Sequence, residues 1–349
     1  MGKPLADYVK LPELEEYKEW FKNFADLHRE DGILQVTWKT NDGPMHHSGM
    51  SHRAISQLVR VLSLDYKNEI IIFTHIGDNW MIESDANGWE TYSELPTQRF
   101  QHQYFDDTNL IKNMLFDLDV PTIGAIPGPG FHWDCPMLCD VTICTEDTKI
   151  EVPHAQGGMV PGDGMGLLCQ HYFGTKRGNY YMMTTRQFNA QQMLDWGMVS
   201  EVVAKGKALE RAWEIARMWK HMPYENRTIM SNLAKRPLKK LLVDDLKLHT
   251  VSEQYGSLLS VAAGVMILVS MTRNISAGAV TGGMRLLIWN NLRRRSPGVP
   301  CSKKLLSGMR RFVLVRLRIL MCLNTAMSRR ATRIKEQEGG FSDAIKQSM

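Results

Sequence analysis

A histidine and an aspartate stand near the two ends of one glycine-rich loop. His154 and Asp163 lie within the segment VPHAQGGMVPGDG, residues 152–164. We expect a strand before this loop and a helix after it, a rigid frame that could hold both side chains for acid–base chemistry. The alternative is a glycine-rich surface turn whose polar residues have no role, and the segment alone leaves both interpretations open.

The elements that must position this loop alternate between strands and helices. Hydrophobic periodicity predicts strands at residues 33–40, 69–75, 121–126, 141–144, 149–152 and 199–203. It predicts helices within residues 1–30 and at 51–64, 109–118, 165–173, 179–184, 189–197 and 209–221. Residues 76–106 have no clean period and are predicted to be a long loop or lid. This alternation predicts an α/β layered fold with helices covering a sheet.

Composition predicts a globular protein without a structural metal site. Of the 349 residues, 44% are hydrophobic and 23% are charged, which is ordinary for a globular chain. The six cysteines form no CxxC pair, and no histidine lies at zinc-finger spacing from them. Scattered thiols and a charged segment at residues 1–30 predict a reducing, cytoplasmic location.

The charge of the chain is divided between an acidic body and a basic end. Residues 264–349 hold 16 Lys or Arg against 3 Asp or Glu, and all eleven histidines lie at or before His249. We expect residues 264–349 to be a peripheral helix pair or a disordered extension, a basic helix that contacts a membrane surface or partner, or non-natural coding sequence. The apolar run at 256–271 is shorter than the roughly 20 residues of a membrane span. No motif for reading nucleic acid accompanies the basic residues, so we expect no nucleic-acid partner.

Several motifs resemble the crotonase (enoyl-CoA hydratase/isomerase) superfamily over residues 30–260. They are CDVT at 139–142, VPH at 152–154, GMVPG at 158–162, AQQMLDWGMV at 190–199 and AWEIA at 212–216. The resemblance implies a core of repeated ββα turns forming a spiral, with C-terminal helices that build trimers or dimers of trimers. It suggests an N-terminal helical segment at 1–30, a catalytic domain at 31–263 and an extension of unknown role at 264–349.

Within that superfamily the chain is most similar to the oxocamphor hydrolase family of β-diketone hydrolases. The loop VPGDG at 160–164 and the later GTKRG at 174–178 carry this similarity. The resemblance implies a catalytic set of His52, His132, His154, Asp163 and Glu253. It also implies substrate binding by Phe131, Trp133 and His47, the last standing where the family has a tryptophan.

Carbon–carbon cleavage of a β-diketone suits this set of residues. We expect His154 to take a proton from water, and His132, paired with Asp163, to act as a charged donor to the oxyanion or enolate. His52 and Glu253 would orient water or substrate. Each proton transfer supplies roughly 10²–10⁴-fold of rate. No metal or organic cofactor is expected, because the substrate's second carbonyl is already the electron sink.

Three other functions stay open at this point. A coenzyme A thioester hydratase or isomerase is disfavoured, because the two glutamates of the family's hydratases are replaced by Asp134 and His154, and Phe131 and His132 replace a glycine pair. An altered role in a biosynthetic pathway and a binding module without catalysis are the others. The single residues also have structural alternatives: His52 and Asp163 as helix caps, His132 as a buried polar residue and Glu253 as a solvated one.

Overall fold

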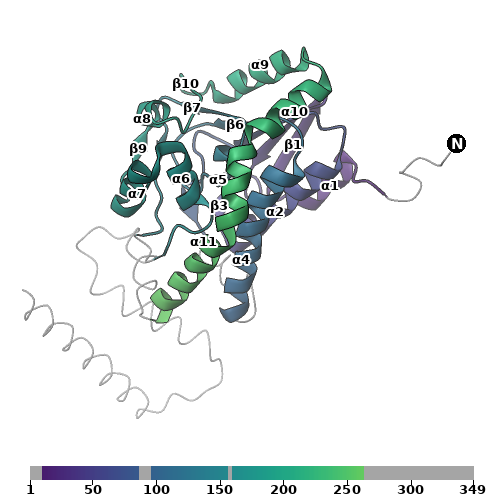
Figure 1. The fold of residues 1–349 in the computed structure, drawn as a ribbon. Coiled ribbons are helices and arrows are strands. Elements are labelled where there is room, and N and C mark those ends of the chain that lie inside the picture. The colour runs from purple at the N-terminus through teal and green to yellow at the C-terminus, as the bar shows by residue number, and fades with distance from the viewer. Residues whose placement is uncertain (1–9, 86–95, 156–158, 263–349) are drawn as a thin grey trace, which may run out of the picture. The chain divides into compact units, whose positions relative to one another are not determined.

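The computed structural model describes residues 10–85, 96–155 and 159–262, which form a mixed α/β fold (Figure 1). The sequence predictions for residues 264–349 lie outside this part of the chain. Within the described ranges, no helix is both long and apolar enough to span a lipid bilayer.

A six-stranded sheet with the order β1-β2-β4-β6-β7-β10 is the framework of the fold. β1 runs antiparallel to β2, and the other neighbours are parallel. β3 pairs with β5, and β8 with β9, in two small sheets. The strands are β1 Ala25–Glu30, β2 Ile33–Trp38, β3 His46–His47, β4 Ile70–His75, β5 Glu83–Ser84, β6 Thr122–Ile126, β7 Val141–Thr145, β8 Lys149–Ile150, β9 Phe188–Asn189 and β10 Glu201–Val203.

One face of the main sheet is covered by α9. Isoleucines of β4 and β6 pack there against Ala212, Trp213 and Ala216. Burial on both faces explains why β4 and β6 are almost continuous apolar runs. The described helices are α1 Leu14–Phe21, α2 Gly49–Leu64, α4 Pro96–Lys112, the π-helical turn η2 Asn113–Asp117, α5 Asp134–Met137, α6 Met165–Phe173, α7 Thr175–Thr184, α8 Ala190–Asp195, α9 Ala208–Lys220, α10 Tyr224–Ala234 and α11 Arg236–Ala262.

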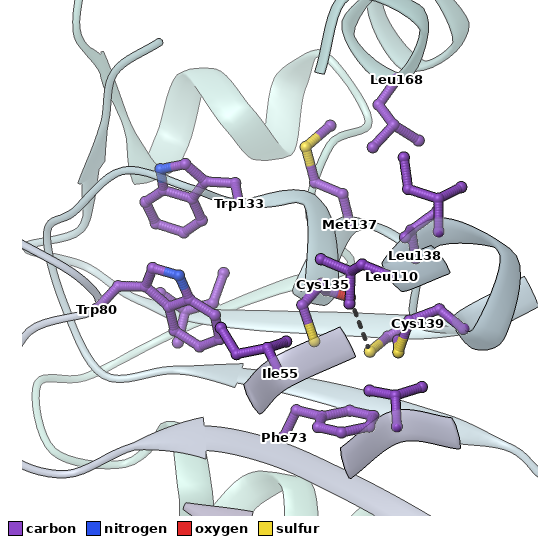
Figure 2. Close-up of a cluster of buried hydrophobic side chains, with 14 of the residues drawn as sticks. Ile55, Phe73, Trp80, Leu110, Trp133, Cys135, Met137, Leu138, Cys139 and Leu168 are labelled. Carbon is purple, nitrogen blue, oxygen red and sulfur yellow. Dashed lines mark hydrogen bonds between the residues drawn. The ribbon is translucent and has the colours of Figure 1, made fainter. Parts of the chain in front are cut away.

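The other core lies among α2, α4, α5 and α6. Figure 2 shows Ile55 of α2, Leu110 of α4 and Leu168 of α6 in this cluster, together with the cysteines of α5 and the turn after it. Trp80 and Trp133 stack within it with ring centroids 6.0 Å apart. α11 packs against both α4 and α6, so that helices distant in sequence enclose one region.

Most predicted elements are confirmed, but two segments were predicted wrongly. The helix near the N-terminus ends at Phe21, and residues 25–30 form β1, in which buried and exposed residues alternate. The turn into β2 is made by Asp31 and Gly32, both with positive φ. Residues 96–106, predicted to be loop, belong to α4. The buried face of α4 includes the polar residues Asp106 and Asp107, so its sequence lacks the apolar period expected of a helix.

Candidate active site

The loop that contains His154 and Asp163 folds back so that the two side chains meet. His154 Nε2 lies 3.0 Å from Asp163 Oδ2 and 3.8 Å from Oε1 of Glu253, which comes from α11. The other oxygen of Asp163 accepts the backbone N–H of Met165, the first residue of α6. Asp163 is therefore fixed by a helix N-terminus on one side, and it binds the imidazole of His154 on the other.

A second histidine–carboxylate pair forms at the turn after β6. His132 Nδ1 lies 2.9 Å from Asp134 Oδ1, and the side chain of Asp134 is buried. His132 has a φ of 63°, a left-handed backbone conformation that non-glycine residues seldom adopt. Its carbonyl accepts the indole N–H of Trp80, and Phe131 is bonded to Met81 through its backbone N–H. These bonds hold the unusual backbone that aims the ring.

The third pair joins α2 to α4. His52 Nε2 lies 2.9 Å from Asp107 Oδ1, and both side chains are buried. The second oxygen of Asp107 accepts a hydrogen bond from Nε2 of Gln254 at 3.3 Å. The N-cap of α2 is Ser48, whose hydroxyl accepts the N–H of Ser51, so His52 is not needed for that role.

Three imidazoles stand together where these segments meet. The ring centroid of His132 lies 4.8 Å from that of His47 and 5.0 Å from that of His52. His47 also makes an edge contact with Phe131 at 5.6 Å. β3 pairs with β5, which positions His47 opposite Ser84. Mutual repulsion of imidazoles this close disfavours protonation of all of them at once.

The surroundings drive the imidazoles to different charge states. Burial opposes the charged form of His132, but the carboxylates of Asp134, Asp163 and Asp107 outweigh it and raise the pKa of His132 to about 9. Burial lowers the pKa of His47 well below its ordinary value, and His132 lowers it further. At neutral pH the site therefore pairs a cationic His132 with a neutral His47.

The other half of the site is also polarised. Burial opposes protonation of His154, but Asp163 outweighs it and raises the pKa of His154. His154 in turn outweighs burial and holds the pKa of Asp163 below its ordinary range. Burial, reinforced by Asp163, raises the pKa of Glu253 well above its ordinary range. The site therefore favours the neutral form of Glu253 and the ionised form of Asp163.

By distance alone, three overlapping groups of side chains could hold a metal ion. The ligand atoms of each group lie within 4.8 Å of one another. The groups are His47 with His52 and His132, His132 with Asp134 and Asp163, and His154 with Asp163 and Glu253.

Comparison with known proteins places the chain in a family. Residues 32–258, well over half of the sequence, match the family model described as enoyl-CoA hydratase/isomerase. The chain belongs to the enoyl-CoA hydratase/isomerase family. The crotonase fold expected from its motifs is confirmed. An enoyl-CoA hydratase/isomerase from Mycobacterium paratuberculosis shares that fold, with a TM-score of 0.64 and 16% identity over 74% of this chain and 99% of that one.

Two other proteins have a higher sequence identity to this chain than the Mycobacterium paratuberculosis protein. A β-diketone hydrolase from the cyanobacterium Anabaena sp. PCC 7120, solved with (S)-3-oxocyclohexyl acetic acid, is 29% identical with a TM-score of 0.66, covering 72% of this chain and 99% of its own. A carnitinyl-CoA dehydratase from Proteus mirabilis is 35% identical over 104 residues. That match spans 29% of this chain and only 40% of the dehydratase.

The structure brings the five catalytic residues expected from the family resemblance into one connected group, but it changes one pairing. The expected pair of His132 with Asp163 is wrong, since His132 bonds to Asp134 and Asp163 bonds to His154. Asp134 is only two residues from His132 and meets its ring directly. Asp163 still lies close enough to raise the pKa of His132.

The remaining expected residues divide between the site and its support. Phe131 contacts the ring of His47, so two of the three expected substrate-binding residues lie side by side. Trp133 is fully buried, and its indole N–H is bonded to the carbonyl of Gly130, so it supports the loop from the core. Glu253 is buried, contrary to the alternative of a solvated helix residue. The catalytic and binding roles themselves stay predictions.

The sequence analysis did not identify Asp107 and Gln254 as site residues, and it did not predict that Asp134 pairs with His132. Asp107 lies in α4, directly after the stretch 76–106 that lacks a clear period, and 55 positions separate it from His52. Asp134 was considered only as a shortened hydratase acid. Leu110 and Ile111 follow Asp107 by three and four positions, so on a helix the three side chains share one face. This spacing is a weak indication in the sequence that the carboxylate of Asp107 points inward.

Gly162 lets the loop that contains His154 and Asp163 lie directly on α11. A Cβ at this position would stand 2.0 Å from the carbonyl oxygen of His249 and 2.7 Å from Cβ of Glu253. We expect Gly162→Ala to lower the free energy of unfolding by about 3 kcal/mol, the usual size of an overpacking penalty. Gly43→Ala is the matched control, because the nearest atom to its Cβ is at 3.9 Å. Urea unfolding of both variants measures the difference, and equal stabilities would contradict the expectation.

Proposed function

We propose that this protein is a hydrolase that cleaves a carbon–carbon bond of a β-diketone. The observation that carries the proposal is the meeting of three histidine–carboxylate pairs, in which His132 is a cation at neutral pH beside the pair of His154 and Asp163. The similarity to the Anabaena β-diketone hydrolase, over 99% of that chain, supports it. The wider enoyl-CoA hydratase/isomerase family alone would leave several reactions open.

The reaction begins with attack of water on one carbonyl carbon of the diketone. Asp163 holds Nε2 of His154, which leaves Nδ1 to take the proton of the attacking water. Asp163 also raises the pKa of His154, which makes the neutral imidazole a stronger base. Asp134 holds Nδ1 of His132, so Nε2–H of this cation is the donor available to the developing oxyanion.

Collapse of the tetrahedral intermediate breaks the bond to the central carbon of the diketone. The electron pair of that bond moves into an enolate with the second carbonyl, while the first carbonyl becomes a carboxylic acid. The proton that His154 took from water returns to the enolate carbon. One cyclic diketone and one water therefore give one keto acid, whereas one linear diketone and one water give a carboxylic acid and a separate ketone. No redox equivalent or coenzyme enters the balance.

A coenzyme A thioester hydratase or dehydratase is the second candidate. The local similarity to carnitinyl-CoA dehydratase favours it, as does the wider family. Against it, Asp134 is bonded to His132 and buried, which leaves this carboxylate unavailable to a thioester or to water.

Direct assay separates these functions. The full-length protein is incubated without coenzyme A with a panel of cyclic and linear β-diketones, and separately with crotonyl-CoA and carnitinyl-CoA. We expect cleavage of at least one diketone, to a keto acid if it is cyclic or to a carboxylic acid and a ketone if it is linear. Mass spectrometry should detect one ¹⁸O from labelled water in the carboxyl group. Turnover of the thioesters while every diketone is left intact would overturn the hydrolase proposal.

We propose further that the protein assembles as a homotrimer or a hexamer of two trimers. Members of the superfamily are typically oligomeric, and apolar side chains on α10 and α11 are exposed in the single chain: Ile229, Met230, Leu233, Val243, Leu248, Val251 and Tyr255. Burial of such a surface favours association. Light scattering of the full-length protein should give three or six times the chain mass. A monomer at micromolar concentration would contradict this assembly.

A further inference from the structure

Two neighbouring side-chain pairs connect α2 to α4. His52 and Arg53 follow each other on α2, and Asp106 and Asp107 follow each other on α4. Arg53 Nε lies 3.3 Å from Asp106 Oδ2, and His52 Nε2 lies 2.9 Å from Asp107 Oδ1. The arginine side chain is 32% exposed, whereas that of His52 is 3% exposed. The two pairs thus occupy the same junction but face different surroundings.

Asp107 is held from two directions inside the protein. His52 binds one of its oxygens, and Gln254 of α11 donates to the other. Gln254 directly follows Glu253, whose carboxyl lies 3.8 Å from His154. Burying a carboxyl group with its charge is costly unless hydrogen bonds compensate it. Two polar partners from two helices therefore connect the two halves of the site through Asp107.

We infer that Asp107 is a positioning residue, which accepts the Nε2 proton of His52 and thereby fixes the orientation and tautomer of that imidazole. The opposite nitrogen of His52, Nδ1, is then held in a defined tautomer and direction. Its ring stands edge-on to His132 with centroids 5.0 Å apart, so a rotated ring would also disturb the charged donor. This role rests on the proposed function of the site, and it adds a residue that the sequence did not reveal.

The physical reason is the one that makes the third member of a catalytic triad effective. A carboxylate that accepts one imidazole N–H leaves the opposite nitrogen in a defined state and place. Removing a carboxylate that orients a metal-ligating imidazole typically costs 10- to 100-fold, and we expect a loss of the same order for Asp107, which also acts through another side chain. The cost falls on turnover, because a misdirected imidazole weakens transition-state contacts more than substrate binding.

The matched pair Asp107→Asn and Asp106→Asn tests this role. Each variant removes one carboxylate charge from the same junction between α2 and α4. We expect D106N to keep kcat within about 3-fold of the wild type. We expect D107N to lower kcat by about 10- to 100-fold while KM changes less than about 3-fold. Asp107→Glu, which keeps the carboxylate, should recover part of the loss.

Nitrogen NMR of the free protein labelled with ¹⁵N-histidine gives a readout that needs no substrate. The signals of His52 are assigned with the variant His52→Gln. In the wild type and in D106N, Nε2 of His52 should carry a proton, and in D107N this preference should weaken. A wild-type His52 without a proton on Nε2, or D107N with wild-type kcat, would overturn the inference. Failure of every diketone assay would instead overturn the proposed function, and the NMR comparison would still decide the role of Asp107.

Discussion

Asp163→Asn is expected to lower kcat by roughly 10³–10⁴-fold, the effect produced when the carboxylate of a histidine dyad loses its charge. Asparagine keeps the shape of the side chain and an oxygen for the N–H of Met165, so the start of α6 should remain intact. What disappears is the charge that outweighs burial at His154. The imidazole then becomes a weaker base, and nothing fixes which of its nitrogens faces the water.

The pH profile of this variant distinguishes a chemical cause from a structural one. Asp163 raises the pKa of His154, so removing its charge should lower that pKa. Activity that requires neutral His154 should consequently extend to lower pH in D163N than in the wild type, even though its maximum is much lower. Asp195→Asn, on the exposed surface of α8, is the control. A loss of less than 10-fold in D163N would contradict the role of Asp163.

His132→Gln is expected to lower kcat by about 10²–10³-fold, which is the loss usually caused by removing one donor to an oxyanion. Glutamine can still donate a hydrogen bond, but it carries no charge and cannot bind Asp134 as a cation does. KM should change little, because the missing interaction develops mainly in the transition state. Steady-state kinetics on a cleaved diketone measures both constants. His171→Gln, an exposed histidine on α6, should behave like the wild type.

The charge of His132 also fixes an alkaline limit. Its pKa of about 9 means that kcat/KM of the wild type should fall as pH rises through about 9, and this limb should be missing in H132Q. Stability follows the same sign. A histidine whose pKa is raised from about 6.5 on folding stabilises the protein fully below pH 6.5, and this contribution is lost as pH rises toward 9. The melting temperature of the wild type should therefore fall more over this interval than that of H132Q.

The sequence was sufficient for the parts of the fold that have a strong pattern. β4, with its run of isoleucines, and α6, which follows the loop of His154, lie where they were predicted. β1 was not predicted, because its short alternation of buried and exposed residues directly follows the stronger helical periodicity of α1. α4 was missed in part because a helix that turns acidic residues inward does not show a simple apolar stripe.

The candidate site was predictable as a set of residues but not as a set of contacts. The motif resemblance identified His52, His132, His154, Asp163 and Glu253. The pairing of each imidazole with a carboxylate depends on side-chain positions to within about 1 Å. The spacing of residues along the sequence does not determine these positions. Asp107 illustrates this limit, because its link to His52 exists only once α2 and α4 are packed together.

The contribution of α11 has a consequence for how the protein is made. Glu253 and Gln254 lie near the end of this helix, yet they reach His154 and Asp107, whose segments precede it along the chain. On a ribosome, which releases the chain from its N-terminus, the earlier strands and helices can fold before α11 has emerged. A nascent chain therefore lacks the carboxyl group of Glu253 and the amide of Gln254 until α11 has been made, and the polar network around His154 and Asp107 is completed only after the other described elements.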